Sequence, residues 1–138
     1  MLFRSGNMEY LKHGGRIGKV ASVAGSLLGI KPIITLKEGE IFPSGIGRSR
    51  RKTVDKTIDL LLAYLAEEKT DIADYSICIG YGYDKEEAVE FRDRLVSRLK
   101  EKGYDIDTIP IFQIGATIGV HTGPYPLGIG VVKKSSRE

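Results

Sequence analysis

Strands and helices alternate through the second half of the chain, and this alternation limits the folds that the sequence can adopt. Residues 54–65 carry apolar side chains at helical spacing, and residues 75–81 form a short apolar run that predicts a strand. A capping box at Asp84 and Glu87 opens another helix, and residues 108–114 again predict a strand. Such alternation is typical of an α/β fold.

The first half of the chain adds an antiparallel element to this pattern. Residues 32–36 and residues 41–43 predict two strands that a short glycine-bearing turn joins into a hairpin, and residues 129–132 predict the last strand. A hairpin is incompatible with a wholly parallel sheet. We therefore expect an α/β fold with a two-layer mixed β-sheet of about five to six strands and helices mainly on one face.

The N-terminal region predicts two helices after an irregular start. Residues 7–13 form a short helical stretch that Gly14 and Gly15 close, and residues 18–28 have apolar side chains on one helical face. Residues 1–6 have neither a helical nor a strand period, so we expect a non-native or disordered lead. At 138 residues the chain fits one domain, which we place at residues 7–134.

Composition restricts the compartment and the partners. The single cysteine, Cys78, excludes an internal disulfide, and its apolar surroundings predict a buried thiol in a reducing compartment. A net charge of +3 is too small to indicate a nucleic-acid partner. We see neither an apolar run of the roughly 20 residues that span a membrane nor a signal peptide. These features predict a cytoplasmic protein with no stable membrane insertion.

Residues 115–130 are the strongest candidate for a binding site. The segment holds five glycines and two prolines, with His121 and Thr122 at its centre. Glycines let a backbone approach a ligand closely, and the N–H groups of such a loop can hold an anion. The alternative is a tight loop in which the histidine has an ordinary structural partner.

Two arginine segments are weaker candidates. Arg16 follows Gly14 and Gly15 at a helix entrance, where a guanidinium and backbone N–H groups can share one anion; the alternative is a helix C-cap followed by a surface arginine. Arg48 and Arg50 belong to a basic run that either forms a solvated face or docks an acidic partner or phosphate.

Catalytic chemistry has little support in the sequence. The two histidines, His13 and His121, are far apart along the chain, and one cysteine cannot build a zinc cluster. A Gly-x-Ser-x-Gly nucleophile elbow is also missing. We expect no catalytic residue, no metal and no cofactor.

Two long motifs resemble those of the DegV family. The first covers residues 10–20, contains Gly-Gly-Arg-Ile-Gly, and continues through residues 25–33 and 36–40; the second covers residues 114–124. The resemblance spans residues 8–133. DegV proteins have two domains and bind one fatty acid between them. The chain resembles the C-terminal domain, so the resemblance implies that the N-terminal domain, which supplies Ser and Thr hydroxyls to the fatty-acid carboxylate, is absent.

The resemblance also implies roles for individual residues. His121, Arg16, Thr122 and Thr117 are implied to form the network around the fatty-acid head group. Arg48 and Arg50 are implied to contact a kinase or the head group. The residues implied to line the acyl-chain pocket are Ile17, Val20, Ala24, Leu27, Leu28, Ile33 and Ile118.

The implied function is that of a lipid carrier and not of an enzyme. Bacterial members present a long-chain fatty acid to a separate fatty-acid kinase, which makes an acyl phosphate for phospholipid synthesis. The alternative is a phosphotransfer substrate domain similar to that of dihydroxyacetone kinases, in which His121 bonds the substrate covalently. A stable His121 adduct after incubation with dihydroxyacetone would favour this alternative.

Overall fold

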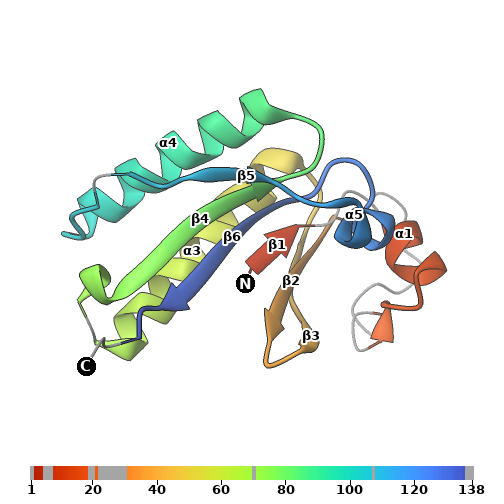
Figure 1. The fold of residues 1–138 in the computed structure, drawn as a ribbon, viewed down its shortest axis with the longest axis horizontal. Helices are drawn as coiled ribbons and strands as arrows, with labels where there is room; N and C mark the ends of the chain where they lie inside the picture. The colour runs from red at the N-terminus through yellow and green to blue at the C-terminus, as the bar shows by residue number, and fades with distance from the viewer. Residues whose placement is uncertain are drawn as a thin grey trace.

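The computed structural model describes residues 2–4, 8–18, 21, 31–69, 71–106 and 108–135, and these residues build one six-stranded sheet with helices beside it (Figure 1). The order of strands across the sheet is β3-β2-β1-β6-β4-β5. The strands are β1 (Leu2–Arg4), β2 (Lys31–Lys37), β3 (Glu40–Gly47), β4 (Tyr75–Tyr81), β5 (Ile111–Gln113) and β6 (Leu127–Lys133). The helices are α1 (Met8–His13), α3 (Arg50–Glu68), α4 (Lys85–Glu101) and α5 (Ala116–Thr122), with a 3₁₀ turn, η2, at Ile72–Asp74.

The sheet is mixed, as the sequence predicts. β2 and β3 form the expected antiparallel hairpin, and β1 and β6 continue the antiparallel pattern. β4 and β5 are parallel, because α4 carries the chain back between them. The fold expected from the sequence, a mixed α/β sheet of five to six strands, is confirmed.

One face of the sheet carries the helical layer of α3 and α4. Ser49 caps α3 by accepting a hydrogen bond from the Lys52 backbone N–H, and Asp84 caps α4 by accepting one from the Glu87 N–H. Both helices bury one apolar face against β4 and β6. The most deeply buried members of this core are Ile58, Leu61, Leu65, Ile79, Ala88, Leu95, Leu99 and Ile129.

The other face of the sheet carries α1 at one end. Thr35 lies beside α3, so its neighbour Ile34 points to the opposite face, since side chains alternate along a strand. There Ile34 is fully buried against Leu11 of α1, and Met8 and Ile17 pack around the pair. α5 lies beside α1 at the same end of the molecule (Figure 1).

Two expectations from the sequence need correction. We set residues 1–6 outside the fold, but Leu2–Arg4 form β1, which pairs with β2 on one side and with β6 on the other. Cys78 is half-buried and not a core thiol, because the buried positions of β4 are Tyr75, Ile77 and Ile79 and Cys78 therefore points away from the helical layer. The predicted helix at residues 18–28 falls largely outside the described residues.

Candidate functional site

Gly14 and Gly15 end α1 in a Schellman motif. Gly15 has a φ of 64°, the Arg16 N–H donates to the Leu11 carbonyl over 2.8 Å, and the Gly15 N–H donates to the Lys12 carbonyl over 3.1 Å. The glycine pair therefore forms a helix C-cap. This was the alternative interpretation of the segment in the sequence. The motif leaves Arg16 exposed directly behind the helix end.

Ala116–Thr122, predicted as part of a glycine-rich loop, forms the short helix α5 instead. Gly115 and Gly123 flank the helix, and the Gly123 N–H donates to the Gly119 carbonyl over 2.8 Å. Glycine is common at helix ends because it tolerates the non-helical backbone there. Of the five glycines that predicted a loop, Gly115 and Gly123 flank this helix, Gly119 lies within it, and Gly128 and Gly130 belong to β6.

The His121 ring lies directly against the backbone of Gly14. A Cβ placed on Gly14 would be only 2.0 Å from His121 Nδ1, a distance that real atoms do not adopt. Nδ1 is buried, and within the described part of the chain it has no hydrogen-bond partner. Gly14 thus provides the space that His121 occupies.

A second glycine contact joins the same two helices in the opposite direction. A Cβ on Gly123, at the end of α5, would be 2.7 Å from Cδ2 of Tyr10 in α1. The absence of side chains at Gly14 and Gly123 lets α1 and α5 approach closely. The two motifs singled out in the sequence therefore lie side by side, although they come from opposite ends of the chain.

The polar residues predicted around the head group differ in exposure. Arg16 and Thr117 are exposed, whereas Thr122 is 1% exposed and its hydroxyl donates to the Ile118 carbonyl over 3.1 Å. This hydrogen bond stabilises the last turn of α5. The structure brings His121 and the Arg16 turn to the same end of the molecule, while the role of each residue toward a ligand stays a prediction.

The predicted acyl-chain residues do not share one surface. Ile17 is half-buried against Leu11 and Ile34, whereas Ile33 is fully buried and points to the other face of β2. Ile118 is 42% exposed on α5. Ile34 is the residue that belongs with Ile17, and the alternation of side chains along residues 32–36 could have identified it. Val20, Ala24, Leu27 and Leu28 lie outside the described residues.

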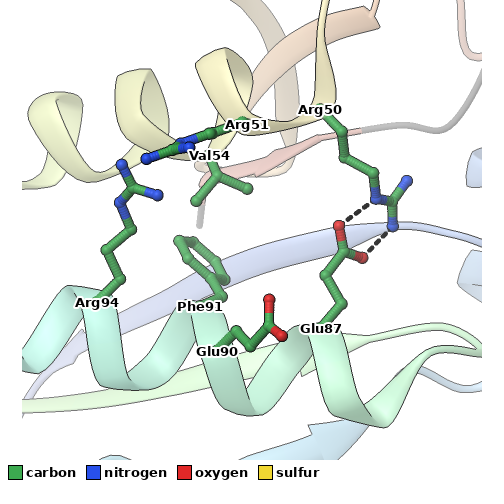
Figure 2. Close-up of a pocket in the computed structure, with 7 residues that line it drawn as sticks. All are labelled: Arg50, Arg51, Val54, Glu87, Glu90, Phe91 and Arg94. Atoms are coloured by element: carbon green, nitrogen blue, oxygen red, sulfur yellow. Dashed lines mark hydrogen bonds and ion pairs between the residues drawn. The ribbon is translucent and has the colours of Figure 1, made fainter.

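Arg50 is held within the protein. At the start of α3 its guanidinium forms a two-pronged ion pair with the Glu87 carboxylate of α4, and Nη2 also donates to the Tyr125 carbonyl over 3.3 Å (Figure 2). Arg94 pairs with Asp55 over 2.7 Å in the same groove between α3 and α4. Arg48, Arg51 and Lys52 are the exposed basic residues of this run.

Among the described residues, no cluster of three or more His, Cys, Asp or Glu side chains could hold a metal ion. Over the same ranges, no helix combines the length and the apolar character needed to cross a bilayer.

Comparison with known proteins identifies the family. A family model for DegV, described as "Uncharacterised protein, DegV family", matches residues 1–134. The chain belongs to the DegV family. A DegV domain-containing protein of Clostridium perfringens is 36% identical over 135 residues, which cover 98% of this chain and 44% of that relative. The chain thus spans less than half the length of this DegV relative.

Solved DegV structures agree with the fold. A stearic-acid-binding protein from Eubacterium ventriosum is 40% identical with a TM-score of 0.82, and the match covers 96% of this chain and 44% of that one. A DegV family protein from Thermus thermophilus, described by its fatty-acid binding, is 28% identical with a TM-score of 0.74 at the same coverage. The resemblance to DegV proteins noted in the sequence is confirmed.

Proposed function

We propose that this chain is the C-terminal domain of a fatty-acid carrier and contributes part of the site for one long-chain fatty acid. The observation that supports the proposal is the packing of His121 against Gly14, which brings the two family motifs into contact. The proteins from E. ventriosum and T. thermophilus, similar to this chain over 96% of its length, are both described as binding fatty acids. An N-terminal domain would complete the site.

His121 is suited to bind a carboxylate through one defined nitrogen. Its Nδ1 is buried against Gly14 and finds no partner among the described residues, so Nε2 is the ring nitrogen left to donate a hydrogen bond. A hydrogen bond to an ionised carboxylate is stronger than one between neutral groups. Arg16 and Thr117, exposed at the same end of the molecule, would add a charge and a hydroxyl, and the buried Thr122 would hold α5 in place.

The apolar surface between α1 and β2 would meet the acyl chain. Each methylene removed from water contributes about 0.8 kcal/mol, so a dry apolar wall is sufficient for the tail. Ile17 is half-buried and would face the tail, whereas Leu11 and Ile34 are fully buried and would support this wall from behind. Val20, Ala24, Leu27, Leu28, Ile33 and Ile118 are the other positions that the family resemblance assigns to the pocket.

The domain would act as a carrier in the cytoplasm and not as an enzyme. A separate fatty-acid kinase would phosphorylate the presented carboxylate for phospholipid synthesis. Arg48 would contact the kinase because it is exposed, whereas the guanidinium of Arg50 is already paired with Glu87.

Histidine substitution in the two-domain protein tests the carboxylate contact. We expect the protein to copurify with a fatty acid, and His121→Ala to weaken retention about tenfold or more, since hydrogen bonds to charged groups contribute about 1.5–3 kcal/mol. Native mass spectrometry and uptake by delipidated protein measure this.

His13→Ala is the matched control, because His13 is exposed in the last turn of α1 and should leave retention unchanged. Delipidated protein that takes up no fatty acid at micromolar concentration would contradict the proposal. Equal retention by both variants would remove His121 from the site.

A further inference from the structure

Residues 123–126 connect α5 to β6, and this connector determines where α5 ends. α5 has seven residues, fewer than an isolated helix needs to be stable in water, and Gly115 gives its first turn no side-chain cap. The helix therefore depends on tertiary contacts at its ends. His121 lies in the last turn of α5, two positions before the connector, so the contacts that hold the connector also restrain this histidine.

Backbone contacts hold the connector on one side. The Gly82 N–H, in the segment after β4, donates to the Pro126 carbonyl over 3.0 Å, and a Cβ on Gly82 would lie only 2.3 Å from the Pro124 carbonyl oxygen. Gln113 in turn donates from Nε2 to the Gly82 carbonyl over 3.1 Å. These contacts fix the backbone on either side of Tyr125.

Arg50 of α3 holds the middle of the connector. Its Nη2 donates to the Tyr125 carbonyl over 3.3 Å, and its guanidinium carbon lies 5.8 Å from the centroid of the Tyr125 ring. The ring of Tyr83 packs edge-on against the same tyrosine, with 5.8 Å between the ring centroids. One arginine side chain thus contacts both the backbone and the ring of a residue that is 75 positions away in the sequence.

The Glu87 carboxylate orients this guanidinium. It accepts hydrogen bonds from both Nε and Nη2 of Arg50, which fixes the plane of the guanidinium (Figure 2). The Arg50 and Glu87 side chains are 33% and 19% exposed, so water competes only in part for this pair. A lysine could neutralise Glu87, but its ammonium has no planar fork with which to hold the carboxylate and the Tyr125 carbonyl in one fixed geometry.

Arg94 provides a comparison within the same groove. It also joins α4 to α3, through an ion pair with Asp55 over 2.7 Å. Arg94 lies at the opposite end of the groove from Arg50 (Figure 2), and in the described part of the chain it forms no hydrogen bond or ion pair with the connector. The link from the helical layer to the connector is therefore specific to Arg50 and is not shared by every ion pair between the two helices.

We propose that Arg50 is a positioning residue for the candidate site. By holding Tyr125 it holds the end of α5, and it thereby keeps the His121 ring against Gly14 without touching a ligand itself. This role differs from the head-group or kinase contact that the family resemblance implies for Arg50. The effect on the His121 ring concerns this chain alone, whereas the consequence for a fatty-acid carboxylate rests on the proposed function.

NMR spectra of the 138-residue chain test this role, because the chain has only two histidines. We expect Arg50→Ala to shift the His121 ring resonances and to speed hydrogen exchange of the Gly123 N–H, which closes the last turn of α5, about tenfold. Arg94→Ala, which removes a similar ion pair, should change neither. His13, exposed in α1, is the internal reference and should keep its resonances in every variant.

Arg50→Lys separates the loss of charge from the loss of the Tyr125 contact. The lysine keeps a positive charge opposite Glu87, so this variant should fold even if Arg50→Ala does not. We expect it to shift the His121 resonances as well, because the contact with the connector is lost. In the two-domain protein, Arg50→Lys should weaken fatty-acid retention and Arg94→Ala should not.

Equal effects of Arg50→Lys and Arg94→Ala on the His121 ring would overturn the proposal and leave the proposed function standing. A two-domain protein of unchanged sequence that takes up no fatty acid would instead contradict the proposed function, and the NMR comparison would still decide the role of Arg50. A shift of the His121 resonances confined to the Arg50 variants would support the positioning role.

Discussion

Gly14 fixes the position of His121 by lacking a side chain. Its backbone does not have a positive φ, so alanine would fit the local conformation, and the only obstacle is the His121 ring 2.0 Å from the new Cβ. Gly15, the next residue, is the reverse case, because its φ of 64° disfavours alanine while nothing lies within 4 Å of a Cβ there. The two neighbouring glycines thus separate a packing role from a conformational one.

Gly14→Ala should therefore displace His121 and weaken fatty-acid retention in the two-domain protein about as much as His121→Ala does. Gly15→Ala should cost about 1 kcal/mol of stability and leave the His121 ring in place. Histidine resonances in NMR spectra report the ring, and thermal unfolding reports stability. Unchanged His121 resonances in Gly14→Ala would show that the ring does not depend on this contact.

For single residues, the sequence predicts which chemical groups would contact a ligand, and these roles stay predictions, but it does not predict what holds the groups in place. His121 and Arg16 are conspicuous because glycines surround them. The contact between Gly14 and His121 is tertiary and joins opposite ends of the chain, so no local pattern predicts it. The hydrogen bond from Thr122 to the Ile118 carbonyl likewise depends on a helix that the glycines concealed.

Among the elements, those with strong local signals were the most predictable. β4 spans the residues 75–81 that were predicted for it, and α4 begins at the predicted cap, Asp84. α5 was missed because its flanking glycines are typical of loops, and β1 was missed because three residues are too few to show a period. In a full capping box the glutamate side chain also accepts a hydrogen bond from the N-cap backbone N–H. Here the Glu87 carboxylate forms an ion pair with Arg50 of α3.

Two arginines that are two positions apart in the sequence should behave differently on substitution. Arg50→Ala removes the ion pair between α3 and α4 and should lower the free energy of unfolding by about 1–2 kcal/mol, reduced from a fully buried value because the Arg50 side chain is 33% exposed. Arg48→Ala should leave stability unchanged and weaken capture by a fatty-acid kinase. Urea unfolding and a pull-down with the purified kinase measure the two effects.

Each variant is the control for the other: Arg48→Ala for the unfolding measurement and Arg50→Ala for the pull-down. Undiminished capture by Arg48→Ala would place kinase docking elsewhere. A loss of stability in Arg48→Ala as large as that in Arg50→Ala would mean that Arg48, too, has a structural partner.

On the scale of the whole molecule, the two faces of the sheet are unequal. The face under α3 and α4 carries the large core that includes Leu95, whereas the α1 face, as far as the structure describes it, rests on the small cluster around Leu11 and Ile34. Local opening is expected where few apolar contacts hold an element. Among the described residues, the candidate site lies on the face with the smaller apolar cluster.

Leu95→Ala should lower global stability by about 2–5 kcal/mol, because it leaves a cavity in the large core. Leu11→Ala should have a smaller global effect and should speed hydrogen exchange mainly in α1 and α5. Denaturant unfolding and site-resolved hydrogen exchange distinguish the two cases. An equal global loss in both variants, without faster exchange in α1, would show that the two faces unfold as one unit.

The position of β1 also determines when the sheet can close. β1 comes from the start of the chain, yet one of its two neighbours is β6, the last strand that the chain supplies. On the ribosome the hairpin of β2 and β3 and the unit from β4 through β5 can form while synthesis continues, because their contacts are local. β1 can pair with β2 early, but its other neighbour, β6, is synthesised last, so the six-stranded sheet is completed only once the residues of β6 have left the ribosome.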